Sequence, residues 1–431
     1  MSRFLPSLFP TAQSDPELHR VRPALEFAFL NALTWQIAVG TPMVLFVQRL
    51  GGSPFQVGLA FAALYLMTPV QVLATALLPR YGFKRLTLGG WRTRSFFLLV
   101  PLALALARPE PGNAWCIAAL VGSVMCFCFF RCVGVAAQPA WLYALIPESL
   151  RGRYFASEQL SGGIAGALTL VLSAALFALL PFYPAIFSQY LIALLGSTLS
   201  YYALKRLPDA PAPASGGIHR ILVDIPRHLF ASGGFRRYLW LSSGWMLLTT
   251  PIPPFAAYYL KAGPQFSAGS IMTLEVLRYL AMGVGAWLIR RWIDVRGIRF
   301  FFQAALLGLG LVLLHWLAYL RFGFGGYAGL CVAYVLFGSA SVCWLVASAN
   351  YLPRVMPAGE QALMVALYGA ATYVIGGLAP VLWGPLLKNQ AGFSVGAFGV
   401  FFLCELAATG LLAALMMRRL DWSRPTAAAS A

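Results

Sequence analysis

One stretch that decides the fold is residues 114–141, AWCIAALVGSVMCFCFFRCVGVAAQPAW. It holds a single charged residue, Arg131, and its apolar residues do not alternate with polar ones. The hydrocarbon core of a bilayer is about 30 Å thick, so a spanning helix needs ~20 apolar residues in a row. The stretch is long enough to cross a membrane, and its unbroken apolar character favours a helix over a barrel strand.

Eleven further stretches of the same kind occur along the chain. The twelve apolar runs cover residues 24–48, 55–79, 86–107, 114–141, 155–180, 184–204, 237–260, 268–290, 300–320, 326–350, 362–387 and 394–417. Only 10% of the 431 residues are charged and the mean hydropathy is +0.75, which is too apolar for the surface of a soluble domain. The sequence therefore predicts an all-α integral membrane protein with twelve transmembrane helices. The third run is the least regular, because Arg92 and Arg94 lie in its first half, where they could snorkel to the inner surface.

The net charge of +18 would suggest nucleic-acid binding in a soluble protein. No nucleic-acid-binding motif supports that interpretation, and the basic residues are concentrated in connecting loops. With the N-terminus placed inside, 24 of the 31 Lys and Arg residues fall in inner segments and five in outer loops. The positive-inside rule therefore predicts a multi-pass protein of the inner (cytoplasmic) membrane with both termini in the cytoplasm, where the arginines face anionic lipid.

The sequence offers no constellation of catalytic or metal-binding residues. The four His are scattered, the seven Cys lie in apolar runs as small buried filler, and no Gly-rich phosphate loop follows a strand. We expect no enzyme activity, no cofactor and no metal site. Charged residues precede the first apolar run, so that run is expected to remain as a helix and not to be a signal peptide.

The sequence also divides into two similar halves. Residues 205–236 include a Pro-, Ala-, Ser- and Gly-rich segment typical of a linker. We therefore expect a six-helix bundle in 1–204, a cytoplasmic linker in 205–236 and a second six-helix bundle in 237–431. Proline positions repeat at offsets of 209, 210 and 210 residues: Thr41-Pro42 with Thr250-Pro251, Pro54 with Pro264, and Pro147 with Pro357. A steady offset indicates duplication, and the prolines that break the seventh run mark a candidate outer gate.

Two loops resemble the signature of a known transporter family. The loop after the second run reads PRYGFKR (79–85) and the loop after the eighth reads DVRGIR (294–299); both resemble the Asp-Arg-x-Gly-Arg-Arg loop of the major facilitator superfamily. The segment from Pro139 to Phe155 is similar to the junction of helices four and five in many bacterial members. The resemblance names no subfamily. It implies two six-helix bundles related by a pseudo-twofold axis along the membrane normal, and secondary transport by alternating access.

The resemblance further implies that residues of these loops latch the two bundles in one state. They are Gly82, Lys84 and Arg85 in the first loop and Asp294, Arg296 and Gly297 in the second. A glycine permits a tight turn, and basic side chains can bond helix-terminal carbonyls or pair with an acid. The first loop has Pro79 where the acid is expected, so a role in topology alone stays open there. Glu148, Glu158 and Glu360 are the alternative acids.

Ionisable residues inside a bilayer are expensive and are therefore functional candidates. The chain offers Glu26, Arg131, Glu275, Arg278 and Glu405. Arg131 lies about 15 Å from the inner end of its helix, near the midplane, and Gln138 shares its face. Such an arginine must face water, a carboxylate or an anionic substrate. A cavity role and a structural pair, with Glu26 as one possible partner, are the two interpretations; Glu405 is interpreted as structural.

Helices one and eight carry the other candidates. Glu26, Asn31, Thr34 and Thr41 fall within an arc of about 140° on helix one, as a cavity wall would, although Glu26 could also lie at the membrane interface. Glu275 and Arg278, three residues apart, can form an internal salt bridge; alternatively Glu275 contacts substrate or carries a coupling proton. The substrate-binding hypothesis comprises Asn31, Thr34, Arg131, Gln138, Glu275 and Arg278, and the proton-coupling hypothesis comprises Glu26 and Glu275.

The leading functional hypothesis is a monomeric secondary active transporter for a small polar or anionic organic solute, with coupling to protons as an added hypothesis. The alternative keeps the fold without transport, as a membrane assembly or scaffold protein. One feature separates the two. A scaffold would seal Arg131 and Glu275 in ion pairs within separate bundles, whereas a transporter would present them to a cavity between the bundles.

Overall fold

The computed structural model describes residues 21–146, 148–211, 233–355, 361–387 and 395–420, and within these ranges the regular structure is entirely helical. Nine stretches of helix among the described residues are long and apolar enough to cross a membrane. One of them, Pro54–Ala107, has 54 residues, more than a single crossing needs. The predicted all-α membrane fold is confirmed, while the count of twelve spans stays a prediction.

The described residues of the first half form ten α-helices and one 3-10 turn, η1. They are α4 (Arg22–Ala38), α5 (Thr41–Arg49), α6 (Pro54–Leu66), α7 (Thr68–Ala74), η1 (Thr75–Leu77), α8 (Leu78–Phe96), α9 (Leu99–Ala107), α10 (Ala114–Val135), α11 (Gln138–Leu145), α12 (Glu148–Leu179) and α13 (Phe182–Lys205). Each predicted run of this half coincides with one helix or with consecutive helices.

In the second half, the part of the chain that the structure describes forms six helices: α15 (Gly233–Thr249), α16 (Ile252–Ala262), α17 (Ala268–Phe322), α18 (Gly326–Val355), α19 (Gln361–Leu386) and α20 (Val395–Arg419). Helix α15 begins at Gly233, four residues before the expected start of the second bundle at 237. Residues 212–232, most of the expected linker, lie outside the described residues.

Two helices are interrupted at the Thr-Pro pairs that repeat in the sequence. Helix α5 begins at Thr41 with Pro42 in its first turn, and α16 follows Pro251. Proline lacks the N–H that the preceding turn would need, so the helix restarts there. The second proline match does not correspond to equivalent helix starts: α6 begins at Pro54, whereas α17 begins only at Ala268, four residues beyond Pro264. The third match, Pro147 with Pro357, lies outside the described residues.

Two glycines make the same sharp turn at corresponding places in the halves. Gly82 has φ 73° and ψ 171°, and Gly297 has φ 75° and ψ 162°, while the residues on either side are helical. This backbone region is essentially restricted to glycine. We call the end of the molecule that carries both turns the turn end, and the opposite end, where α5 and α16 lie, the far end.

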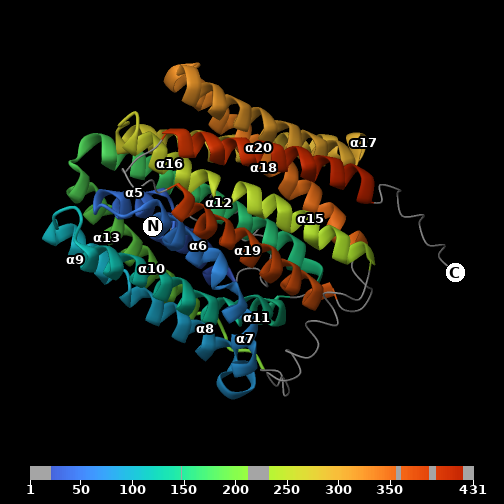
Figure 1. Ribbon diagram of the computed structural model, residues 1–431. Helices are drawn as coiled ribbons and strands as arrows, with labels where there is room; N and C mark the ends of the chain where they lie inside the picture. Colours follow the sequence, from blue (N-terminus) through green and yellow to red (C-terminus); the bar gives the residue numbers. More distant parts are fainter. Residues whose placement is uncertain (1–20, 147, 212–232, 356–360, 388–394, 421–431) are drawn as a thin grey trace.

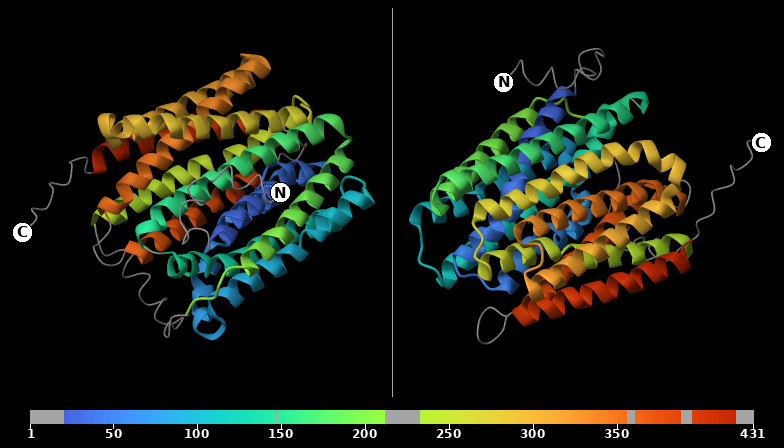
Figure 2. Two further views of the ribbon diagram at one scale, coloured as in Figure 1. Left: turned by 180° about the vertical axis from the view of Figure 1, so that it is seen from behind. Right: turned by 90° about the horizontal axis from the view of Figure 1, so that it is seen from above.

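The two halves pack side by side along their length. Figure 1 shows the first half, blue to green, against the second, yellow to red, and Figure 2 shows the same division from two other sides. Helix α6 packs on α19, α12 on α17, and α5 on α16. A site lined by these helices is therefore shared by both halves.

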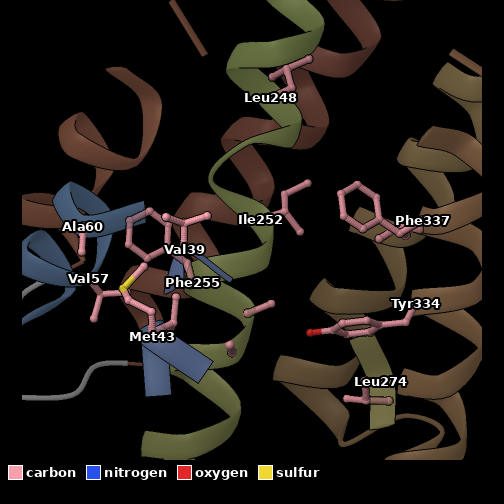
Figure 3. Packing of buried hydrophobic residues seen from close by; sticks show 14 of the residues in the cluster. Val39, Met43, Val57, Ala60, Leu248, Ile252, Phe255, Leu274, Tyr334 and Phe337 are labelled. Carbon is pink, nitrogen blue, oxygen red and sulfur yellow. The ribbon is translucent and has the colours of Figure 1, made fainter. Parts of the chain in front are cut away.

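The halves are in close contact at the far end. Gln48 on α5 donates from Nε2 to the carbonyl oxygen of Tyr258 on α16 at 3.0 Å. A Cβ on Gly58 would lie 2.3 Å from the carbonyl oxygen of Pro380, so α6 and α19 touch backbone to backbone. Figure 3 shows Phe255 of α16 directed at Met43 and Val57 of the first half. This apolar contact closes the far end.

Packing at the turn end has a different character. A separate buried cluster there consists only of residues from the first half, including Leu25, Phe83, Trp141 and Leu204. The main core cluster, by contrast, contains residues of both halves. Apolar packing therefore joins the halves at the far end, while this cluster at the turn end belongs to one half alone.

Candidate functional site

Arg131 lies in α10 at the boundary between the halves. It is half-buried, and it interacts electrostatically with Tyr373 of α19, in the second half, and with Arg94 of α8. Tyr373 is 45% exposed although it sits between helices of both halves, which indicates open space beside it. Arg131 is thus near groups of both halves, while its place at the midplane and its cavity role stay predictions.

Three tyrosines continue from Arg131 into the second half. The rings of Tyr65 on α6 and Tyr373 meet edge to face, with centroids 5.8 Å apart and planes at 78°. Tyr65 also interacts electrostatically with Tyr279 and Arg278 of α17. We call Arg131, Tyr65, Tyr373, Tyr279 and Arg278 the central layer. Its members come from four helices, two in each half.

Arg278 is neutralised within its own helix. Its Nε and Nη2 both donate to Oε2 of Glu275, at 2.8 and 2.6 Å, and its guanidinium lies 4.4 Å from the centroid of the Tyr279 ring. Glu275 is only 1% exposed, and its Oε1 has no hydrogen-bond partner in the described part of the chain. The salt bridge predicted from the spacing is therefore present, and half of the Glu275 carboxylate stays uncommitted.

A narrow pocket lies beside Glu275. Tyr334, Phe337 and Trp316 line it together with residues of α16, and it has about the room that one water molecule needs. Figure 3 shows the Tyr334 hydroxyl pointing toward α16. That hydroxyl also has no partner among the described residues. The pocket thus pairs an uncommitted carboxylate oxygen with an uncommitted phenol.

Arg94 is a buried arginine that the sequence analysis did not count among the intramembrane candidates. It is 0% exposed, and its Nη2 donates to Oδ1 of Asn31 at 2.6 Å. Its guanidinium lies 4.5 Å from the ring centroid of Trp91 and 5.1 Å from that of Phe127. Snorkelling is therefore wrong for Arg94, although Arg92 is exposed. Arg94 comes about 16 Å along the helix after Phe83, too far for its side chain to reach the turn end.

The polar residues of helix one do not share one environment. Asn31 contacts Arg94, whereas the Thr34 hydroxyl donates to the Ala193 carbonyl of α13 at 2.9 Å and is fully buried. Glu26 forms ion pairs with Arg22, at 3.3 Å, and with Arg206. These contacts hold Glu26 near the start of α4, so the structure brings together Asn31, Arg94 and Arg131 but not Glu26.

Gln138 is separated from Arg131 by a helix break. Helix α10 ends at Val135 and α11 begins at Gln138, so the seven-residue spacing does not keep the two side chains strictly on one face. Gln138 is 8% exposed. The cause of the break is Pro139, which lacks the N–H that would bond the carbonyl of Val135 and which is tolerated in the first turn of the new helix.

Comparison with known proteins places the chain in a family. The sequence profile of the Major Facilitator Superfamily matches residues 27–380. This chain belongs to the major facilitator superfamily. The resemblance of its loops is thereby confirmed, and no subfamily is determined. None of the curated proteins matches the sequence significantly.

Solved structures share the major facilitator fold at low sequence identity. A mutant of the nucleoside transporter NupG is 12% identical, with a TM-score of 0.72 over 93% of this chain and 100% of that chain. A bacterial homologue of the iron transporter ferroportin, in an inward-facing state, is 16% identical, with a TM-score of 0.69 over 94% and 99%. A D-xylose–proton symporter is 15% identical, with a TM-score of 0.63 over 94% and 97%. At these identities the likeness shows the fold alone.

The superfamily loop residues have distinct contacts in this chain. Lys84 donates from Nζ to the Leu207 carbonyl at 2.7 Å, just beyond the end of α13, while Arg85 is exposed. In the second loop Arg296 lies 5.4 Å from the centroid of the Phe300 ring. The side chain of Asp294 lies outside the described residues. Lys84 therefore joins two helices of the first half, and the latch between halves stays a prediction.

Glu405 has the surroundings of a structural acid in this major facilitator chain. It is 3% exposed, and its carboxylate accepts a hydrogen bond from Trp383. The two residues tie α20 to α19, away from the central layer. Its Oε2 has no hydrogen-bond partner among the residues that the structure describes.

Glu158, one of the alternative acids named for the first loop, lies near the start of α12 and within the fifth predicted run, 155–180. Its carboxylate interacts electrostatically with Tyr154. A pairing of Glu158 with the first loop stays a prediction.

Proposed function

We propose that this chain is a secondary active transporter that moves a small polar or anionic organic solute across the inner (cytoplasmic) membrane by alternating access. The observation that carries the proposal is the central layer. Arg131 and Arg278, one from each half, flank three tyrosines at the boundary between halves that approach each other closely at the far end. Membership in the major facilitator superfamily supports transport as the function of such a site.

The proposed orientation of the protein in the membrane follows from the distribution of charge. The turn end carries most of the loop arginines and lysines, so the positive-inside rule places it, and both termini, in the cytoplasm. The far end is then the outer side, where Gln48 and Phe255 join the halves. Together with the single-half cluster at the turn end, this supports an inward-facing state, in which solute reaches the central layer from the cytoplasm.

The residues of the proposed site divide by role. Arg131 binds the solute, Tyr65, Tyr279 and Tyr373 offer ring faces and hydroxyls, and Asn31 and Gln138 are polar neighbours on the first half. Arg278 acts through its pair with Glu275. Thr34 is left out of the proposed site, because its hydroxyl is committed to α13. All these groups belong to one chain, so we propose that a monomer is sufficient.

Coupling to protons is assigned to Glu275 in preference to Glu26. Glu275 is buried beside the central layer and has one oxygen without a partner in the described residues, so protonation there would change its pair with Arg278 directly. Glu26 lies near the start of α4 between Arg22 and Arg206. A proton on Glu275 would release Arg278 toward the solute, which is the kind of charge change that alternating access requires.

The scaffold alternative fits less well. It expects both Arg131 and Glu275 to be sealed in ion pairs within separate halves. Glu275 is sealed in this way by Arg278, but Arg131 forms no ion pair among the described residues and faces Tyr373 of the other half. An uncompensated arginine beside exposed tyrosine surface favours a ligand site over a structural pair.

The test is flux in reconstituted vesicles, with and without a proton gradient. A panel of radiolabelled probes should include carboxylates, phosphate esters, nucleosides, sugars and cations. We expect at least one probe to be transported, and Arg131→Ala to reduce its flux at least tenfold. Arg321→Ala, at an exposed arginine in the last turn of α17, is the control and should leave flux unchanged.

Two results would count against the proposal. If no probe crosses the membrane above the rate of empty vesicles, the chain is not a transporter of these solute classes. If a probe crosses but Arg131→Ala transports it at the wild-type rate, transport stands and the central layer is not its site.

A further inference from the structure

The first half contains a buried positive charge that no acid among the described residues neutralises. Arg94 is 0% exposed, and its Nε and Nη1 have no hydrogen-bond partner in the described part of the chain. Its one hydrogen bond goes to the neutral amide oxygen of Asn31. A guanidinium remains charged at any ordinary pH, and a charge at this depth in a membrane protein is costly unless it is paired.

A second arginine lies close to the first. Helices α8 and α10 approach so closely that a Cβ on Gly90 would lie 2.5 Å from the backbone nitrogen of Gly134. Arg94 follows Gly90 by one helical turn, and Arg131 precedes Gly134 by nearly one turn on the antiparallel neighbour. The two side chains therefore lie at the same depth, and their charges act on each other. Like charges this close raise the cost of burial further.

The arginine of the second half is in the opposite situation. The ion pairs formed among the described residues join Arg22 and Arg206 to Glu26, and Arg278 to Glu275. Arg278 and Glu275 together carry no net charge. Arg94 and Arg131, in contrast, keep two positive charges in the first half. The space between the halves is therefore electrically asymmetric, with its uncompensated charge on the side of α8 and α10.

We propose that Arg94 and Arg131 form a subsite for the anionic group, a carboxylate or a phosphate, of the transported solute. The proposal rests on the proposed transport function and narrows its solute class from polar or anionic to anionic. Arg131 is half-buried toward Tyr373 and contacts the anion. Arg94 lies behind it and is a positioning residue, which Trp91, Phe127 and Asn31 hold in place.

The groups around the two arginines are consistent with these roles of Arg131 and Arg94. Cation–π contacts with Trp91 and Phe127 stabilise the Arg94 charge without cancelling it, so its field still reaches an anion beside Arg131. In a site of low dielectric, a second positive charge a few ångströms further away adds substantially to the attraction. The body of an organic anion can then lie on the rings of Tyr65 and Tyr373, which meet at 5.8 Å.

The experiment measures ligand binding to the full-length protein in lipid nanodiscs. Two readouts are used: the shift in melting temperature and the equilibrium binding of labelled probes. The probes are succinate, glucose 6-phosphate, glucose and choline, which separate carboxylate, phosphate, neutral and cationic chemistry. We expect an anionic probe, and neither glucose nor choline, to bind and to raise the melting temperature. Whichever anion binds identifies the preferred group.

Variants at Arg94 test the positioning role. Arg94→Met removes the charge, keeps much of the volume and should weaken anion binding at least about tenfold. Arg94→Lys keeps the charge but loses the planar stacking on Trp91 and Phe127, so it should weaken anion binding less than Arg94→Met does. Arg92→Met, at the exposed arginine two residues earlier, is the matched control and should bind like the wild type. Arg94→Met is also expected to melt no lower than the wild type without ligand, since it removes a buried charge.

The outcomes separate this inference from the proposed function. If Arg94→Met binds anions as the wild type does, or if glucose or choline binds and anions do not, the anionic subsite is overturned while transport is unaffected. If anions bind with the expected dependence on Arg94 but no flux occurs in vesicles, the subsite stands and the transport proposal fails. If Arg94→Met fails to fold, Arg94→Lys and Arg131→Met are compared instead. Arg131→Met is then expected to lose anion binding, and Arg94→Lys is expected to retain it.

Discussion

Gly58→Val is expected to force the far end open and to reduce transport at least about fivefold. In the wild type, a Cβ at this position would lie 2.3 Å from the Pro380 carbonyl oxygen and 3.3 Å from Cζ of Phe255. Backbone cannot yield as a flexible side chain can, so α6 and α19 must separate. Overpacking of this kind costs about 1–3 kcal/mol, which corresponds to a shift of roughly five- to 150-fold between two states. The shift disfavours the state in which the far end is closed.

Hydrogen exchange measured by mass spectrometry provides the readout for this variant. Amides of α16, which lies against α5 in the closed far end, should exchange faster in Gly58→Val than in the wild type. Gly399→Val is the matched control, because a Cβ there meets nothing within 4 Å. If α16 exchanges at the same rate in Gly58→Val, the wild type and the control, the contact with Pro380 does not hold the far end closed.

Breaking the pair between Glu275 and Arg278 is expected to destabilise the protein more than removing both charges. Glu275→Leu leaves a buried guanidinium, and Arg278→Leu leaves a carboxylate that is 1% exposed in the wild type. Each single change should cost about 3–5 kcal/mol in the free energy of unfolding, whereas the double change should be close to neutral. Unfolding in mixed detergent micelles measures the four proteins of this double-mutant cycle.

A second cycle on Glu26 and Arg206 provides the contrast. The Arg206 side chain is 58% exposed, so solvent screens the pair and its coupling should be no more than about 1 kcal/mol. The two cycles therefore differ mainly in burial. Additive effects of Glu275→Leu and Arg278→Leu would mean that the two charges do not stabilise each other, and the pair would then be available for ligand.

The helices and their breaks could be predicted because their causes are local. An apolar run long enough to cross a bilayer is visible in the residues themselves, and each of the twelve runs coincides with helix in the structure. The interruptions at Thr41-Pro42 and Thr250-Pro251 follow from the missing N–H of proline. The glycines of the two turns were recognisable from the loop pattern, although their common torsion angles were not.

Side-chain partners were harder to predict, because they depend on how each helix is rotated against its neighbours. Asn31 and Thr34 share a face of helix one, yet the first contacts Arg94 of α8 and the second Ala193 of α13. Close approach at glycines sets that rotation: Gly196 touches the Leu30 carbonyl and Thr34, and Gly90 touches Gly134. A single sequence shows these glycines but not their partners.

The central tyrosines were missed for a related reason. Tyr65, Tyr279 and Tyr373 lie in apolar runs, where a tyrosine is ordinary and carries no signal of its own. Only the contact of α6 with α19 brings Tyr65 to Tyr373. Arg94 did carry a signal, since an arginine inside a spanning helix is rare. Snorkelling to the inner surface was predicted for both Arg92 and Arg94, but only Arg92 is exposed.

The hydrogen bond from Thr34 to Ala193 has a consequence for synthesis. The two residues are 159 positions apart, and the Ser161 hydroxyl reaches the Leu25 carbonyl across 136 positions. At a translation rate of about 5–20 residues per second, the partner of Thr34 leaves the ribosome roughly 8–32 seconds after it. During that interval the first helix is in the membrane, while the helices that it packs against in the folded protein have not yet been synthesised. Until α12 and α13 are synthesised, the Thr34 hydroxyl lacks the acceptor that it has in the folded protein.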